Sequence, residues 1–343
     1  MSVSTLDASE GGEARRGSPR ARALGWLASN EAGLFLITAL FVALFWSATD
    51  GFSSVFNLYA LTRVLAIDAV IGFSMMVVLA TGGLNLAVGA IGVCGAMAAG
   101  WLMQGLGLSP WLGVPLALGV GAALGALNGL GTVWLRVHSF VVTLATMSIF
   151  FGTMILLTRA NAFNALPAEF VGVAKVRFGF WSALLVVTAL VGVLLWIVFD
   201  RTTLGRRILV AGANERAALI SGVPVGRAIV AAHAMSGTLA ALAGLMLTAR
   251  NGAALPSMAG QLGMDWLLPA FLAPVLGGTL LTGGSVSVLG TFLGAALVTV
   301  LTNGLLQLSV GEFWIQAFLG TVLLIAVGLD RVRAVWIERR RAR

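Results

Sequence analysis

The 343-residue sequence has little charge, a single cysteine and few side chains suited to catalysis. Only 10% of its residues are charged, against about 25% in a typical soluble domain, whereas 59% are apolar. With a mean hydropathy of +1.00, the chain has more apolar side chains than one soluble core can bury. The composition therefore excludes an ordinary soluble protein and an intrinsically disordered one. Cys94 lies inside an apolar run, which excludes a disulfide framework.

The few charged residues also exclude several function classes. The formal charge is +8, but the basic residues are scattered over loops and tails, which argues against a nucleic-acid partner. Lys175 is the only lysine and does not follow a glycine, so a phosphate-binding loop is missing and any ATP hydrolysis belongs to another chain. Asp68, His138 and His233 are the only ionisable residues clearly inside apolar runs. We therefore expect neither an enzyme nor a metal or cofactor bound by this chain.

Long uncharged runs predict an all-α polytopic membrane protein with about ten transmembrane helices, because about 20 residues cross the hydrocarbon core. Glycine-rich breaks could hide a re-entrant segment, so between eight and eleven spans fit the pattern. The expected spans are 32–49, three within 69–135, 137–158, 178–199, 228–249, two within 266–311, and 313–329.

The distribution of basic residues predicts that both termini are cytoplasmic. This orientation places 16 of the 21 Lys and Arg residues inside, as the positive-inside rule requires. Residues 1–28 lack the features of a cleaved signal peptide and are predicted to be a disordered cytoplasmic tail. A permease domain over 29–331 and a basic cytoplasmic tail over 332–343 complete the predicted organisation.

The pattern of an internal repeat appears at a shift of 175 residues, where Asn128-Gly129-Leu130 recurs as Asn303-Gly304-Leu305. Five predicted helices separate the two copies. An odd number of helices inverts the second copy relative to the first, as in many transporters. The alternative is two unrelated helix ends with similar capping.

Uncharged polar residues are the candidates for a solute pathway. Asn85, Phe140, Thr143 and Asn303 are predicted to contribute to its lining, since a dilute polar lining lets a solute pass without trapping it. The alternative for each polar side chain is a hydrogen bond between helices. We expect Asp68 to reach interfacial water or to pair with Arg63, although a proton-coupled carrier that uses Asp68 or His233 stays open.

The hydrophilic segment 200–227 contains the pattern of a complete short helix over residues 215–221. Asn214 is a favoured N-cap, Glu215 suits the positive end of the helix dipole, Gly222 supplies a left-handed C-cap, and Pro224 prevents continuation. Such a rigid helix could dock in a groove of another protein or lie on the lipid surface.

The ordered motifs resemble the membrane permeases of ATP-binding-cassette importers for ribose, xylose and related monosaccharides, a family that includes autoinducer-2 permeases. Thr81-Gly82-Gly83-Leu84-Asn85-Leu86-Ala87-Val88-Gly89 is similar to the family's Thr-Gly-Gly-Ile-Asp-Leu-Ser-Val-Gly. Further similar segments, in order along the chain, are 128–129, 140–144, 203–206, 212–222, 236–244, 276–279, 283–284, 290 and 303–304. Asn85 and Ala87 replace the usual Asp and Ser, and the related branched-chain amino-acid permeases also have Gly-Leu-Asn there.

The resemblance implies a type II importer permease in a bacterial plasma (inner) membrane. It implies a dimer with a second permease copy or a paralogue, a partner ATPase that binds ATP and Mg²⁺, and a soluble solute-binding protein. The expected solute is a monosaccharide or similar polyhydroxylated molecule, with a branched-chain amino acid as the alternative. A purely structural membrane scaffold is a third hypothesis. The residues expected to couple the chain to the ATPase are Gly212, Asn214, Glu215, Ala217, Ala218, Ser221 and Gly222.

Overall fold

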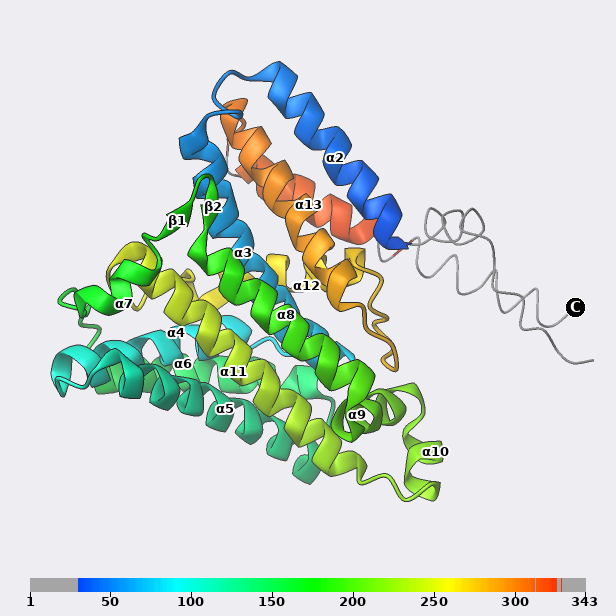
Figure 1. The fold of residues 1–343 in the computed structure, drawn as a ribbon. Helices are drawn as coiled ribbons and strands as arrows, with labels where there is room; N and C mark the ends of the chain where they lie inside the picture. The colour runs from blue at the N-terminus through cyan, green and yellow to red at the C-terminus, as the bar shows by residue number, and fades with distance from the viewer. Residues whose placement is uncertain (1–29, 312, 326–327, 329–343) are drawn as a thin grey trace, which may run out of the picture.

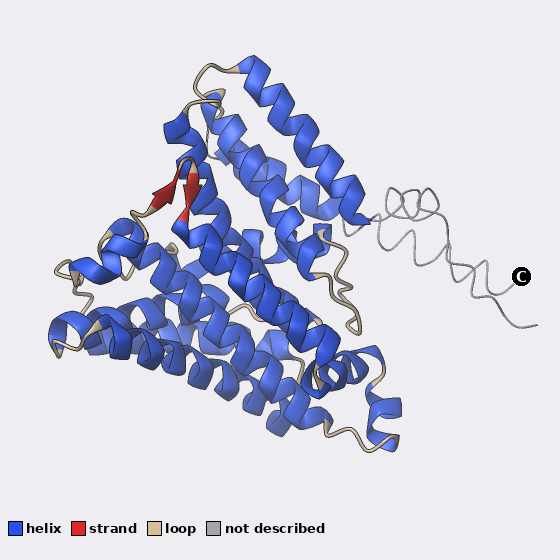
Figure 2. Ribbon diagram, in the orientation of Figure 1, coloured by secondary structure: helices blue, strands red, loops and turns tan. Residues whose placement is uncertain are grey.

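The computed structural model describes residues 30–311, 313–325 and 328, which form a helical bundle with one small hairpin (Figures 1 and 2). The predicted tails, 1–28 and 332–343, lie outside the described residues. The helices are α2 (Asn30–Ala48), α3 (Val55–Leu79), α4 (Val88–Gly100), the π-helix η1 (Trp101–Gly105), α5 (Pro110–Leu135), α6 (Ser139–Thr158), α7 (Ala168–Val173), α8 (Ala183–Arg201), α9 (Thr203–Ala213), α10 (Glu215–Ile220), α11 (Val225–Asn251), the 3-10 helix η2 (Gln261–Trp266), α12 (Leu267–Leu276) and α13 (Val288–Gln307). Strands β1 (Arg177–Phe178) and β2 (Trp181–Ser182) pair antiparallel.

The predicted order of membrane spans is present in the structure. Within the described residues, eight helices are long and apolar enough to cross a membrane: α2, α3, α4 with η1, α5, α6, α8, α11 and α13. Two shorter apolar segments, Gln261–Leu276 and Phe313–Ile325, occupy the eighth and tenth predicted positions. The all-α polytopic fold is thereby confirmed, and eight of the ten predicted spans are helices long enough to cross a membrane among the described residues.

The second span begins well before its predicted start at Ala69. Helix α3 starts at Val55, and the hydroxyl of its N-cap Ser54 accepts a hydrogen bond from the Asn57 amide at 3.2 Å. The prediction divided the sequence at every charged residue and therefore excluded the first turns of this helix.

Charged side chains fit inside α3 because neighbouring helices bind them. Thr299 of α13 donates a hydrogen bond to Asp68 Oδ2 at 3.1 Å, and Arg63 Nη2 donates to the Arg250 carbonyl oxygen at 3.0 Å. The guanidinium of Arg63 also lies over the Tyr59 ring, 5.4 Å from its centroid. Asp68 and Arg63 thus bond to other helices rather than to each other.

The helices differ sharply in burial. Within the best spanning window, 78% of α3 and 72% of α4 with η1 are buried inside the chain, against 17% of α2 and 22% each of α5 and α6. Large apolar side chains on the outer helices are almost fully exposed, among them Trp134 at 84% and Leu157 at 81%. Their natural solvent is lipid, so α3, α4, α11 and α13 form the centre of a membrane bundle.

Glycines allow α5 and α11 to pack backbone against backbone. A Cβ atom on Gly125 would overlap the His233 carbonyl oxygen, and one on Gly121 would overlap the Gly237 carbonyl oxygen. Small residues at such crossings are the usual means of close helix packing in membranes, where no hydrophobic effect pulls helices together.

The two halves of the chain repeat the same packing in inverted orientation. A shift of 175 residues carries 55–79 onto 230–254, which overlaps α11, and 110–135 onto 285–310, which overlaps α13. Helix α3 packs on α12 and α13, and correspondingly α11 packs on α4 and α5. The bonds Arg63–Arg250 and Ser74–Ser236 show that α3 and α11 run antiparallel. These observations support the predicted inverted repeat.

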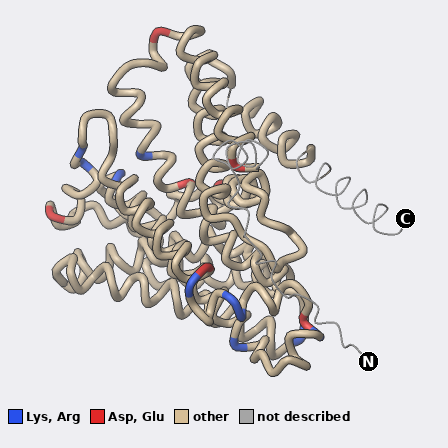
Figure 3. The backbone as a smooth tube through the Cα atoms, turned by 45° about the vertical axis from the view of Figure 1, so that its right-hand side comes forward, with Lys and Arg blue, Asp and Glu red and all other residues tan. Residues whose placement is uncertain are grey.

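The two ends of the bundle are distinct. Helices α9 and α10 follow α8 at one end, and the β1–β2 hairpin precedes α8 at the other (Figure 1). Charged residues gather at the two ends, and the middle of the bundle has few (Figure 3). Of the described basic residues, Arg136, Arg201, Arg206, Arg207, Arg216 and Arg227 lie in or next to the segments at the α9–α10 end.

Candidate translocation pathway and coupling helix

The third span begins with a stretch of non-helical backbone that α6 supports. Helix α3 ends at Leu79, Gly82 has a positive φ of 73°, and α4 starts at Val88. Between them, the Leu84 amide donates to Ser139 Oγ at 2.8 Å, and the Leu86 amide donates to Thr143 Oγ1 at 3.1 Å. Backbone groups at membrane depth need such partners because lipid offers none. Ser139 and Thr143 therefore replace the missing helical hydrogen bonds.

Asn85 lies at the centre of this break and is fully buried. Its Nδ2 donates to Ser236 Oγ on α11 at 2.9 Å, and its Oδ1 accepts the Ala87 amide at 3.1 Å. Ser236 Oγ also lies 2.9 Å from Ser74 Oγ on α3. Asn85 thus joins the broken span to two central helices.

A second discontinuous span lies in the other half. In η2, Leu262 and Gly263 have positive φ angles of 57° and 76°, and regular helix resumes at Leu267. Gly263 contacts the backbone of Gly89 so closely that neither position has room for a Cβ atom. The N-terminal ends of α4 and of η2–α12 therefore meet at this contact. Discontinuous helices that meet between inverted repeats form the solute sites of many transporters.

The four predicted pathway residues do not converge on one place. Asn85, Phe140 and Thr143 lie together where the first turn of α6 supports the broken span, with Thr143 buried and Phe140 42% exposed. Asn303 lies near the C-terminal end of α13, where it exchanges two hydrogen bonds of 3.0 Å with Asn57. The lining role of these four residues stays a prediction.

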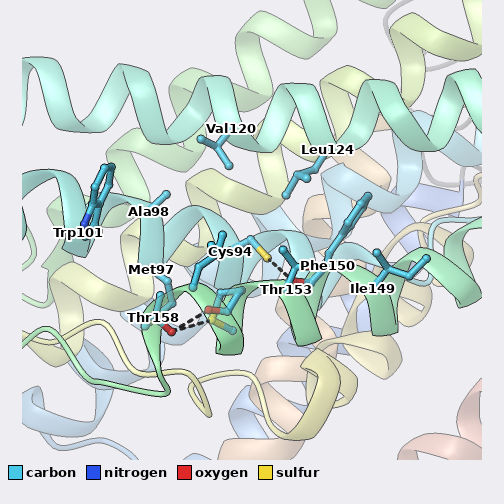
Figure 4. A pocket seen from close by; sticks show the side chains of 12 residues that line it. Cys94, Met97, Ala98, Trp101, Val120, Leu124, Ile149, Phe150, Thr153 and Thr158 are labelled. Atoms are coloured by element: carbon cyan, nitrogen blue, oxygen red, sulfur yellow. Dashed lines mark hydrogen bonds between the residues drawn. The ribbon is translucent and has the colours of Figure 1, made fainter.

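A cavity of 660 Å³ between α4, α5 and α6 is apolar (Figure 4). Its wall includes Cys94, Trp101, Leu124 and Ile149. The hydroxyl of Thr158, also in the wall, already donates to its own helix at Met154, 2.8 Å away. The wall offers a sugar few hydrogen-bonding partners, so this cavity suits an apolar occupant such as a lipid chain.

The predicted short helix is present as α10. The Oδ1 of its N-cap Asn214 accepts the Ala217 amide at 3.0 Å, and Gly222 has a positive φ of 76° after the last turn. The helix ends at Ile220, one residue before the predicted end, and Ser221 is its C-cap. Capping residues alone therefore defined this element correctly.

The residues predicted to contact an ATPase differ in exposure. Asn214, Glu215, Ala217, Ser221 and Gly222 are exposed, but Ala218 is fully buried against its own chain. Gly212 packs against the loop after α3, where a Cβ atom would overlap the Ala80 carbonyl oxygen. The prediction missed Leu219 and Ile220, which are 56% and 89% exposed and whose apolar type gave no sign that they face outward.

Catalytic and metal-binding groups are sparse in the part of the chain that the structure describes. No group of three or more His, Cys, Asp or Glu side chains there could hold a metal ion. His233 is buried on α11, and His138 caps α6 by accepting the Phe140 amide on Nδ1 at 3.2 Å.

Inverted halves, two discontinuous spans and many lipid-facing apolar residues define a polytopic membrane transport protein. The chain belongs to the family described as the permease component of branched-chain amino acid transport systems, which matches residues 54–327.

Relatives with specific names cover nearly the whole chain. It is 37% identical over 306 residues to the ribose import permease protein RbsC of Bacillus subtilis (strain 168), covering 88% of this chain and 92% of that one. It is 31% identical over 322 residues to the D-allose transport system permease protein AlsC of Escherichia coli (strain K12), covering 93% and 96%. The fructose import permease protein FrcC of Rhizobium meliloti is 31% identical over 297 residues, with coverages of 84% and 80%. No solved structure matches the chain.

Proposed function

We propose that this chain is the permease subunit of an ATP-driven importer that carries a monosaccharide or a similar polyhydroxylated solute into a bacterium. The observation that carries the proposal is the near full-length similarity to permeases named for the import of ribose, allose and fructose. The discontinuous spans and inverted halves supply the architecture that such a subunit needs to open to either side.

The energy comes from a partner ATPase that binds ATP and Mg²⁺, and this chain itself binds no cofactor or metal. The sequence has no phosphate-binding loop, whereas α10 presents Leu219 and Ile220 at one end of the bundle. When α10 docks in a groove of the ATPase, closure of the ATPase would be transmitted to α8 and α11 as a rigid-body movement. Two permeases, either two copies of this chain or this chain and a paralogue, form the complete pathway.

In this proposal the α9–α10 end faces the cytoplasm, as do both termini, and the protein resides in the bacterial plasma (inner) membrane. The opposite end carries the exposed rings of Phe178 and Trp181 beside Lys175 and Arg177. Aromatic and basic side chains on a small hairpin offer a contact surface for a soluble solute-binding protein.

A branched-chain amino acid is the second candidate solute because the family description names that class. The two candidates are separated by uptake of labelled ribose, allose, fructose and leucine into vesicles that contain the permease, its ATPase and its binding protein. The proposal predicts ATP-dependent uptake of one of the sugars and none of leucine. Uptake of leucine alone would assign the chain to the amino-acid branch.

A further inference from the structure

A second cavity, of 610 Å³, lies between α10 and the adjoining ends of α5, α6 and α11. Its volume is within the range of roughly 300–1,000 Å³ that small-molecule sites occupy. The Thr81-Gly82-Gly83 turn of the broken span forms part of its wall, and so does Ser139, which supports that span. Glu215 and Leu219 of α10 form another part. The cavity therefore connects the broken span with the coupling helix.

His233 lines this cavity and carries a buried hydrogen-bonding atom without a partner among the described residues. The side chain is fully buried, and its Nδ1 lies 3.0 Å from the Ile229 carbonyl oxygen. A carbonyl only accepts, so Nδ1 carries the proton, and in the neutral ring Nε2 is then an acceptor. Nε2 has no hydrogen-bond partner among the described residues. A buried acceptor without a partner is uncommon and calls for a donor such as a hydroxyl group.

Other groups around the cavity also favour a neutral, hydroxylated ligand. Arg136 and Glu215 both line it, so the wall carries charges of both signs rather than an excess of one. Thr132 lines it as well, with a hydroxyl that donates to the Asn128 carbonyl oxygen at 2.9 Å and can still accept a hydrogen bond. Side chains that donate and accept hydrogen bonds without a net charge match a polyol better than they match a phosphate or a carboxylate.

We propose that this cavity is a binding site for the released solute, a free monosaccharide, with His233 Nε2 accepting a hydrogen bond from a sugar hydroxyl group. The proposal rests on the proposed function for the identity of the solute. In this proposal the cavity is the last site that the sugar occupies before the sugar enters the cytoplasm.

The test uses the full-length chain in nanodiscs, with a reporter cysteine introduced into a Cys94→Ala background. Leu219→Cys lies in the cavity wall, and Ile220→Cys, the next residue, does not. Millimolar ribose, allose or fructose is added before a charged thiol reagent, and the rate of labelling is measured. One of these sugars should slow labelling at position 219 and leave position 220 unchanged, and leucine should have no effect at either position.

Two substitutions of His233 separate ligand binding from a structural role. His233→Asn keeps a donor where Nδ1 lies and removes Nε2, whereas His233→Gln places an amide where Nε2 lies. His233→Asn should raise the sugar concentration for half-protection about tenfold, as expected for one lost hydrogen bond, and His233→Gln should stay within about threefold of the parent. Thr248→Val, which removes a buried hydroxyl that bonds only within α11, should leave protection unchanged.

Equal protection in the parent and in His233→Asn would overturn the proposal, and so would loss in His233→Gln with retention in His233→Asn. Protection at both reporters would also overturn it, because the sugar would then act outside the cavity. The assay needs neither ATP nor uptake, so its failure is distinguishable from failure of the proposed function. A chain that imports ribose but shows no protection by ribose at position 219 contradicts only the site.

Discussion

At the scale of single residues, buried polar groups hold irregular backbone inside the helical bundle. Ser139 and Thr143 accept amide hydrogens that no helix satisfies, and Asn85 connects the same segment to α11. Within the described part of the chain, each hydroxyl is the only partner of the amide it serves, so these side chains have a structural role in the observed conformation. A solute pathway beside them has to open through movement of α6 or of the broken span.

Cysteine accessibility tests the predicted pathway residue by residue. Cysteines at Asn85, Phe140, Thr143 and Asn303, in a Cys94→Ala background, are exposed to a water-soluble thiol reagent with and without ATP in the assembled importer. Phe140 is 42% exposed, whereas Asn85 and Thr143 are fully buried, so the latter two should react only in one nucleotide state. Resistance of all four positions in both states would disprove the lining assignment.

Close packing at Gly125 gives a prediction for stability. In Gly125→Leu the new side chain meets the α11 backbone at His233, so the helices have to separate. Overpacking of this kind costs about 1–3 kcal/mol or more, and the midpoint of thermal unfolding in detergent should fall. Gly119→Leu is the matched control. Gly119 lies on the same helix, and a Cβ atom placed there would meet no described neighbour within 4 Å, so this variant should unfold near the parent temperature. Equal midpoints for the two variants would contradict the packing described for α5 and α11.

At the scale of elements, the predictions from sequence succeeded where the signal is local. Asn214, Gly222 and Pro224 define α10 because capping acts within one turn of the chain. The start of α3 was wrong because Arg63 and Asp68 form hydrogen bonds with Arg250 and Thr299, more than 180 residues away. The contact of Gly89 with Gly263 and the cavity beside His233 depend on long-range packing in the same way, and no local pattern indicates them.

The coupling helix yields a prediction at this scale. Ala217→Trp adds bulk to an exposed face of α10, and Gly222→Val opposes a φ of 76°. Both variants should insert into the membrane, since neither residue lies in a span, and both should lose ATP-driven uptake. Ala218→Trp is a poorer probe because Ala218 is buried against its own chain, so its effect would mix docking with local packing.

Purification with the partner ATPase followed by a transport assay checks this prediction. Gly107→Val is the matched control for backbone strain, since Gly107 has a positive φ of 66°. A Cβ atom placed there would meet no described neighbour within 4 Å, and Gly107 lies far from α10, at the other end of the bundle. This control should assemble and transport normally. If Ala217→Trp and Gly222→Val also transport normally, α10 rests on the lipid surface instead of docking in an ATPase.

At the scale of the whole molecule, the inverted halves explain how one chain can serve a pathway that opens to either side. Helix α3 packs on α12 and α13 as α11 packs on α4 and α5, so the same interfaces exist in both orientations. The repeated Asn-Gly-Leu motif at Asn128 and Asn303 indicated the shift of 175 residues in the sequence. In the structure the two asparagines have different surroundings. Asn303 is paired with Asn57, whereas both side-chain amide atoms of Asn128 lack a hydrogen-bond partner among the residues that the structure describes.

The central claim is that this chain moves a monosaccharide with energy supplied by another subunit. The most direct measurement is uptake of the labelled sugar into proteoliposomes that contain the purified permease, its ATPase and its binding protein, with either ATP or a pH gradient as the only energy source. We expect accumulation with ATP, no accumulation with the pH gradient, and none when the ATPase is omitted. Accumulation driven by the pH gradient in liposomes that contain this chain alone would contradict the account and would instead indicate a proton-coupled carrier that uses Asp68 or His233.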